Sequence, residues 1–194
     1  HIETGEKKYI LFVGRLDIFH KGIDLLLEAF KKASEKIDDD LYIICKGTLY
    51  GKHELKKLLV KNGIESRVKV LGEKKGKEKE KYFSNAKFAL FPSRFEGQSL
   101  SVLEMMALGK PFICFDIPEY KWASNKICYK AKPFSVQELT DKIIALSADF
   151  GKRVSMGKEA RKQALDYTWD KCANKYNLFL RRVIRDHLIR SMKN

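Results

Sequence analysis

Short apolar runs alternate along this 194-residue chain with longer segments whose apolar residues recur at helical spacing, and this alternation constrains the fold most. A short continuous apolar run is typical of a strand that is covered on both faces. Strands that alternate with helices are joined by crossovers and pair in parallel. We therefore predict an α/β fold, with a doubly wound, Rossmann-like parallel sheet of about six strands and helices on both faces. The predicted strands are Tyr9–Val13, Leu41–Cys45, Val68–Leu71, Phe88–Phe91, Pro111–Phe115 and Lys126–Lys130.

The helices follow from the same periodicity and from the residues that flank them. Asn62-Gly63 is a helix stop signal, and Ser135 followed by Glu138 is a start signal. The chain is long enough for one domain with a sizeable core and an appended helix. The predicted helices are 23–37, Lys52–Lys61, Lys77–Ser84, Ser99–Leu108, Ser135–Leu146, Lys152–Leu165 and Asp170–Met192.

Composition limits the partners and the cellular compartment. The net charge of +14 favours anionic partners such as nucleotide phosphates, acidic lipid or nucleic acid, although lysines spread over helix faces are typical of a solvated surface. The four cysteines lack paired or metal-binding spacing, so we expect no metal site and a reducing, cytoplasmic setting. No apolar run approaches the roughly 18 residues of a membrane span. The chain begins at His1 without Met, so we expect a fragment or a processed protein.

The stretch Phe88–Pro111 predicts an anion site. A buried strand leads through a loop into an apolar helix that begins near Ser99, so the helix N–H groups and the positive end of its dipole point into the loop. Glu96 lies in that loop and Glu104 lies in the helix. Phosphate at the helix end and hydroxyls at the carboxylates describe a sugar nucleotide. Alternatively, Ser101 and Glu104 form a plain capping box, and Glu96 is a solvated loop acid.

A second group of polar residues follows the first predicted strand, at the sheet edge where ligands bind in such folds. Gly14 permits a tight turn, Arg15 offers a forked donor for phosphate, and Lys21 is a mobile point charge. The alternative is that both cations simply lie on the surface. We expect the adjacent His20 to be an ordinary loop residue.

Two aromatic residues follow the fifth predicted strand. Tyr120 and Trp122 could stack on a ligand, but aromatic side chains beside a sheet more often contribute to packing. We therefore expect both to pack against the edge of the domain.

Segments of the sequence, in order, resemble the nucleotide-sugar-binding half of the family 4 (group 1) retaining glycosyltransferases, which have the two-domain GT-B fold. FEGQSLSVLEMMALGKP is similar to the family signature of two glutamates separated by seven residues. FVGRLDIFHKGIDLLLEAF is similar to its opening strand, loop and helix, and KGTLYGKHELKKLLVKNGIESRVKVLGE to the next two units. The resemblance runs from about Tyr9 to about Lys175.

Carried over by position, the resemblance implies a role for each site residue. Arg15 and Lys21, beside Gly14, would bind the diphosphate. Glu96 and the loop amides would hold the sugar and the distal phosphate, and Glu104 would accept hydrogen bonds from the ribose hydroxyls. The loop amides would come from Gly97, Gln98, Ser99 and Leu100, and the base would lie at Leu71 and Gly72.

The function that the resemblance implies is sugar transfer. The intact enzyme would move a sugar from a UDP-, GDP- or ADP-sugar to an acceptor hydroxyl, with retention and without a metal or other cofactor. Arg15, Lys21 and the loop amides would stabilise the departing diphosphate, and Glu96 would position the sugar. Two alternatives stay open: a sugar-nucleotide epimerase-like enzyme of the same fold, and a non-catalytic basic module that binds RNA or acidic membrane. No aromatic platform or known motif supports nucleic-acid binding.

The resemblance also implies a domain organisation. Residues 1–8 would be a leader or linker, 9–169 the donor-binding domain, and 170–194 an amphipathic helix. In the family this helix crosses back to an N-terminal acceptor-binding domain that this sequence lacks. We therefore expect its apolar stripe, from Ala173 to Leu188, to be partly exposed and the chain to be inactive alone. Because the helix is also basic, peripheral attachment to the inner face of the plasma membrane is a further hypothesis.

Overall fold

The computed structural model describes residues 6–97 and 99–191, with side chains as far as residue 187. Within them, six strands form one sheet in the order β3-β2-β1-β4-β5-β6, and every neighbouring pair is parallel. This confirms the predicted α/β, Rossmann-like sheet. The strands are β1 Tyr9–Arg15, β2 Asp40–Lys46, β3 Val68–Gly72, β4 Ala89–Phe91, β5 Phe112–Phe115 and β6 Cys128–Ala131. The last of these begins two residues after the expected Lys126, beyond a turn that Ser124 stabilises.

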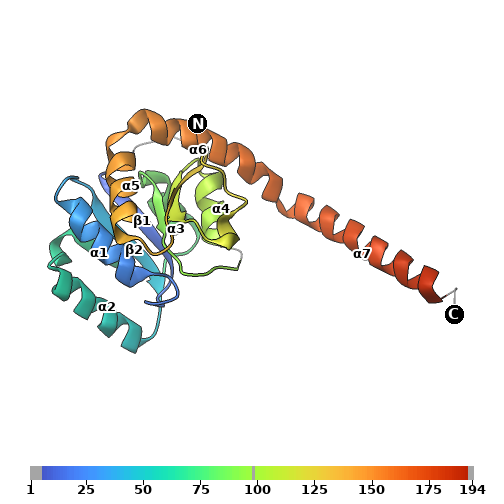
Figure 1. Cartoon of the computed structure of the whole chain (residues 1–194), viewed down its shortest axis with the longest axis horizontal. Coiled ribbons are helices and arrows are strands. Elements are labelled where there is room, and N and C mark those ends of the chain that lie inside the picture. The colour runs from blue at the N-terminus through green and yellow to red at the C-terminus, as the bar shows by residue number, and fades with distance from the viewer. Residues whose placement is uncertain (1–5, 98, 192–194) are drawn as a thin grey trace.

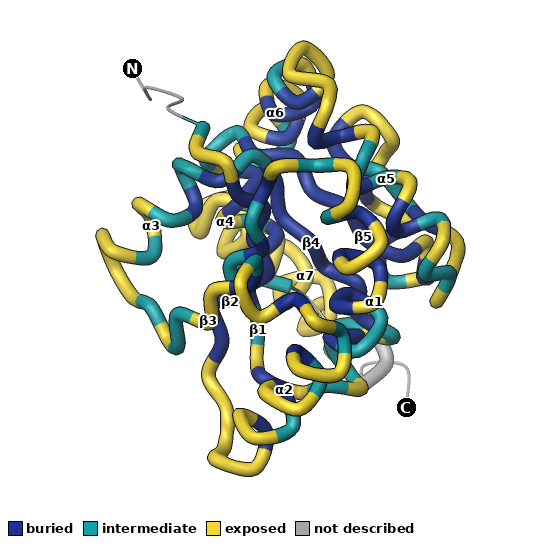
Figure 2. Tube along the Cα trace, turned by 90° about the vertical axis from the view of Figure 1, so that its left-hand side faces the viewer, coloured by how far each residue is buried: buried dark blue, intermediate teal, exposed yellow. Residues whose placement is uncertain are grey.

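The central strands are apolar throughout because helices cover both of their faces. β1 pairs with β2 on one side and with β4 on the other. Its residues Tyr9–Val13 are buried, and so is the whole of β4 (Figure 2). The core therefore sits around β1 and β4.

The helices lie where the periodicity predicts them, with starts set by capping residues. Thr48 accepts a hydrogen bond from the amide of Gly51 and begins α2 three residues before the expected start, and Asp149 likewise begins α6 early. Ser135 caps α5 as expected. The helices are α1 Ile23–Ser34, α2 Leu49–Asn62, α3 Gly76–Asn85, α4 Leu100–Ala107, α5 Val136–Ala148, α6 Phe150–Ala164 and α7 Trp169–Ser191. Three short 3-10 helices were not expected: η1 Glu65–Arg67, η2 Pro118–Tyr120 and η3 Leu165–Tyr167.

The strand order fixes where a ligand can bind. β2 lies beside β1 on one side, whereas β5 lies beside β4 on the other. Right-handed connections therefore place α1 and α4 on opposite faces of the sheet. In agreement, α1 packs against α2 and α5, while α4 packs against α6. The loops that follow β1 and β4 diverge from neighbouring strands, and this switch point is where doubly wound sheets bind ligands.

The last helix, α7, projects away from the rest of the protein (Figure 1). Its apolar side chains are exposed, which confirms the partial exposure expected for the stripe that starts at Ala173. The side chain of Leu188 lies outside the described residues. The exposed apolar residues of this helix are Trp169, Tyr176, Leu178, Phe179, Leu180, Val183 and Ile184. In the described part of the chain, no helix is both long and apolar enough to span a membrane.

Candidate functional site

The β1–α1 loop packs directly on the start of the β4–α4 loop. Gly22 has a left-handed backbone conformation, with φ of 62°, and a Cβ atom placed on it would lie 1.9 Å from the carbonyl oxygen of Pro92. Glycine is thus required here for both conformation and space. This close approach brings the residues that follow β1 against those that follow β4.

Lys21 and Glu96 meet across this contact. The Nζ atom of Lys21 donates to Oε1 of Glu96 at 2.6 Å, and the hydroxyl of Ser93 donates to the same oxygen at 2.7 Å. The side chains of Lys21 and Glu96 are 13% and 7% exposed. The reading of Glu96 as a solvated loop acid is therefore wrong, because a carboxylate this buried needs such partners. Lys21 is likewise no surface cation.

A second ion pair joins the β4–α4 loop to the first turn of α1. The guanidinium of Arg94 donates to both carboxylate oxygens of Asp24, at 2.9 and 2.7 Å, and lies over the ring of Phe19. Its hydrogen bonds to Asp24 raise the pKa of Arg94. Paired guanidinium–carboxylate contacts of this kind fix geometry as well as add stability. Gly14 and Arg15 end β1 beside this loop, and the Lys21 stem runs along Gly14.

The N-terminus of α4 opens toward the same loop. Ser99 is the N-cap residue of this helix, and its side chain makes no capping hydrogen bond to the first turn. The first amides of a helix, here those of Leu100 and Ser101, have no intrahelical acceptor, so they can donate to an anion. Gly97 is exposed, with no atom within 4 Å of a Cβ built on it. Gln98, the remaining predicted loop residue, lies outside the described residues.

Glu104 lies on another side of α4, toward α3. Its Oε1 atom accepts a hydrogen bond from Nζ of Lys79 at 2.7 Å, and the Glu104 side chain is 45% exposed. Because α4 begins at Leu100, Ser101 is already inside the helix and cannot be its N-cap. The capping-box reading is therefore wrong. The two glutamates thus have different partners and lie in different surroundings.

β3 ends four residues before Gly76, the first residue of α3. Gly72 ends β3 with φ of 71°, and Leu71 packs against the core. Gly76, at the start of α3, lines a cavity of about 330 Å³ together with Lys79 and Glu104. Leu71 and Gly72 are not among the residues that line this cavity, and their role in holding the base stays a prediction.

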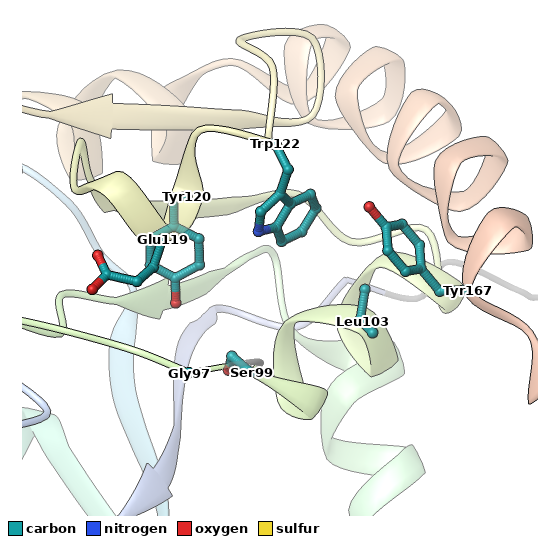
Figure 3. Close-up of a pocket in the computed structure, with 7 residues that line it drawn as sticks. All are labelled: Gly97, Ser99, Leu103, Glu119, Tyr120, Trp122 and Tyr167. Atoms are coloured by element: carbon teal, nitrogen blue, oxygen red, sulfur yellow. The ribbon is translucent and has the colours of Figure 1, made fainter. Parts of the chain in front are cut away.

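An aromatic cavity of about 310 Å³ adjoins the α4 N-terminus (Figure 3). It is lined by Gly97, Ser99, Leu103, Glu119, Tyr120, Trp122 and Tyr167. Tyr120 is buried, and its hydroxyl has no hydrogen-bond partner among the described residues. Burial raises the pKa of Tyr120, and the negative charge of Glu96 raises it further. Tyr120 packs against Phe112 of β5, with ring centroids 6.2 Å apart, as expected, whereas Trp122 is 38% exposed, and both residues line this cavity.

Sequence reasoning missed three partners in the site. Ser93 lies three residues before Glu96, a spacing at which loop side chains can meet, so it could have been proposed. Lys79 is one of many lysines in a charged helix, and nothing local distinguishes it. Arg94 stands 70 residues from Asp24, so its pairing is invisible in sequence.

Which ligand the site binds stays a prediction. Within the described ranges, no group of three or more His, Cys, Asp or Glu side chains could hold a metal ion.

Comparisons with curated proteins find relatives that match most of this chain. An uncharacterized glycosyltransferase of Methanocaldococcus jannaschii is 29% identical over 173 residues, which are 87% of this chain and 46% of that protein. The poly(ribitol-phosphate) alpha-N-acetylglucosaminyltransferase of Staphylococcus aureus is 27% identical over 184 residues, 92% of this chain and 36% of that protein. The chain thus spans less than half the length of these relatives.

Solved structures share the fold. A Staphylococcus aureus TarM variant in complex with fondaparinux, alpha-GlcNAc-glycerol and UDP is 25% identical, with a TM-score of 0.76, and the match covers 92% of this chain and 36% of that one. The pneumococcal O-GlcNAc transferase GtfA, in complex with UDP and GlcNAc, has a TM-score of 0.80 at 20% identity, over 94% of this chain and 37% of that one. Residues 1–163 match the family described as glycosyl transferases group 1. This chain therefore belongs to the group 1 glycosyl transferases.

Proposed function

We propose that this chain is the C-terminal, donor-binding domain of a family 4 retaining glycosyltransferase. The observation that carries the proposal is the buried Lys21–Glu96 contact, 2.6 Å long, at the switch point of the sheet and beside the α4 N-terminus. It brings a cation of the β1–α1 loop and a carboxylate of the β4–α4 loop together beside the free amides of the α4 N-terminus. This is the chemistry that a sugar diphosphate requires.

The proposed catalytic contribution is stabilisation of the leaving diphosphate. Lys21, Arg15 and the first amides of α4 supply positive charge where the phosphate oxygens become more negative as the sugar bond breaks. Glu96 already shares one oxygen with Lys21 and Ser93, which lowers its strength as a nucleophile. We therefore assign Glu96 to holding sugar hydroxyls. Retention would follow from attack of the acceptor on the face from which the diphosphate leaves.

The remaining part of the enzyme is proposed to bind the acceptor. The matches cover only 46% and 36% of two relatives, and α7 exposes an apolar stripe that includes Phe179 and Ile184. A helix with such a face needs a partner to bury it. We propose that this partner is the enzyme's own N-terminal domain.

The first prediction is that this chain binds nucleoside diphosphates without the rest of the enzyme. Affinity should be roughly micromolar to millimolar, since only one wall of the cleft is present. Structures of similar proteins contain UDP, so we expect UDP to bind at least as well as GDP or ADP. Calorimetry with the three nucleotides checks this, and uridine, which has no phosphate, is the matched control.

The Lys158→Ala variant, which removes an exposed cation of α6, controls for a general effect of charge and should bind UDP like the unchanged chain. If no nucleotide binds, or if uridine binds as well as UDP, the proposed donor site is wrong.

The second prediction concerns Glu104. Replacing it with glutamine leaves one acceptor oxygen in place of a carboxylate, so binding of UDP should weaken by about 1–3 kcal/mol, or roughly 5–150-fold. Stability should change by less than about 1 kcal/mol, because the Lys79–Glu104 pair is exposed. Calorimetry and urea unfolding measure the two effects. Lys79→Gln is the matched control, since it removes the same ion pair but keeps the carboxylate; equal losses of UDP binding in both variants would contradict a ribose contact.

A further inference from the structure

His20 occupies a position between the two loops of the site, and its two ring nitrogens contact different elements. Nδ1 lies 3.3 Å from the Nη2 atom of Arg15, at the end of β1. Nε2 lies 2.9 Å from the carbonyl oxygen of Phe95, in the β4–α4 loop. The ring therefore links a proposed phosphate-binding cation to the loop that carries Glu96.

The two contacts fit one protonation state of the ring. A carbonyl oxygen can only accept a hydrogen bond, so Nε2 must carry a proton. A guanidinium can only donate, so Nδ1 must be unprotonated. Both contacts are satisfied together only by the neutral ring with its proton on Nε2.

The surroundings hold the ring in this position. It stacks on Phe95, with centroids 3.9 Å apart and planes inclined by 7°, and the His20 side chain is 15% exposed. The backbone amide of His20 donates to Oδ1 of Asp17 at 2.9 Å. The ring thus has little freedom to turn, and Arg15 receives an acceptor at a fixed place.

We propose that His20 is a positioning residue that holds Arg15 toward the diphosphate through its neutral, Nε2-protonated ring. This inference rests on the proposed function, because it gives Arg15 a phosphate to bind. Arg15 is exposed, and a free arginine side chain loses much conformational entropy on binding. Holding it in advance reduces that cost.

The inference predicts a pH dependence with a defined sign. Protonation of Nδ1 replaces the acceptor by a donor, so the ring repels Arg15, and Oδ2 of Asp17, 3.8 Å away, attracts the new charge. The other charged groups at these loops are paired: Lys21 with Glu96, and Arg94 with Asp24. Binding of UDP should therefore weaken when acid protonates the ring.

Three variants of the whole chain separate the contacts. In His20→Asn, an amide oxygen replaces Nδ1, so the acceptor for Arg15 is kept. In His20→Gln, an amide nitrogen replaces Nε2, so the bond to Phe95 is kept and the acceptor for Arg15 is lost. His20→Phe keeps the stacking alone. At pH 7.5 we expect UDP affinity to fall about 5–10-fold in His20→Gln and His20→Phe, and less in His20→Asn.

Two measurements would not change if His20 had a purely structural role. They are the coupling between Arg15 and His20 in UDP binding, and the pH dependence of UDP binding. Arg15→Ala should weaken UDP binding, and adding His20→Gln to it should cause no further loss. Because the terminal phosphate of UDP also protonates near pH 6, the wild-type affinity is divided by that of His20→Gln at each pH. The ratio should fall from pH 7.5 to pH 5.5. Nitrogen-15 NMR of the histidine side chains, with His20 assigned from the His20→Gln spectrum, should show the proton on Nε2 at neutral pH.

The results distinguish a failure of the proposed diphosphate site from a failure of the positioning role of His20. If Arg15→Ala leaves UDP binding unchanged, the proposed diphosphate site fails, while the NMR spectrum still reports whether the ring accepts from Arg15. If Arg15→Ala weakens binding but the losses from Arg15→Ala and His20→Gln add, or the pH ratio is flat, the positioning role is overturned. A proton on Nδ1 would overturn it as well.

Discussion

Replacing Gly22 with alanine should destabilise the protein by about 2–5 kcal/mol. A left-handed conformation costs a residue with a Cβ atom about 1–2 kcal/mol, and overpacking typically costs about 1–3 kcal/mol more. The added Cβ would lie 1.9 Å from the carbonyl oxygen of Pro92, which belongs to backbone and cannot rotate away. The free energy of unfolding in urea measures the effect.

Gly63 provides the matched control for Gly22. It has φ of 65°, close to that of Gly22, but no atom lies within 4 Å of a Cβ built on it. Gly63→Ala should therefore cost only the conformational part, about 1–2 kcal/mol. Equal losses at the two positions would show that the contact with Pro92 contributes nothing. A larger loss at Gly22, together with weaker UDP binding, is expected because the contact joins the two loops of the site.

Replacing Lys21 with alanine should affect stability and ligand binding together. It leaves the carboxylate of Glu96, whose side chain is 7% exposed, without its cation. Removing one partner of a buried pair typically costs about 3–5 kcal/mol, and Ser93 offsets part of this by its hydrogen bond. The loss of a charged contact to the diphosphate should also weaken UDP binding by about 1.5–3 kcal/mol, or roughly 10–150-fold. Urea unfolding and calorimetry measure the two effects separately.

The double variant Lys21→Ala with Glu96→Gln tests the explanation. Glutamine removes the uncompensated charge, so most of the lost stability should return, whereas UDP binding should stay weak. Glu96→Gln alone should bind UDP within a few-fold of the unchanged chain, since Glu96 is assigned to the sugar. If the double variant regains UDP binding along with stability, Lys21 acts only on folding and not on the diphosphate.

The local features of this fold could be predicted from the sequence. Apolar runs such as Tyr9–Val13 identify strands because burial on both faces requires continuous apolar residues. Helical spacing and the stop at Gly63 identify helices for a similarly local reason. The sequence predicts later starts for α2 and α6 than the structure shows. Thr48 and Asp149 act as N-caps only when the backbone that precedes each helix takes the extended conformation of an N-cap residue.

The sequence by itself determined the class of fold and the approximate positions of its main strands and helices, and it singled out Arg15, Lys21, Glu96 and Glu104 as candidate site residues, since motif spacing and strand ends are properties of neighbouring residues. Only the tertiary structure decided their partners. Lys21 and Glu96 stand 75 residues apart, and they meet because β1 and β4 are neighbours in the sheet. The same adjacency brings His20 to Phe95. Strand order is settled by packing of the whole core, and no local pattern contains it.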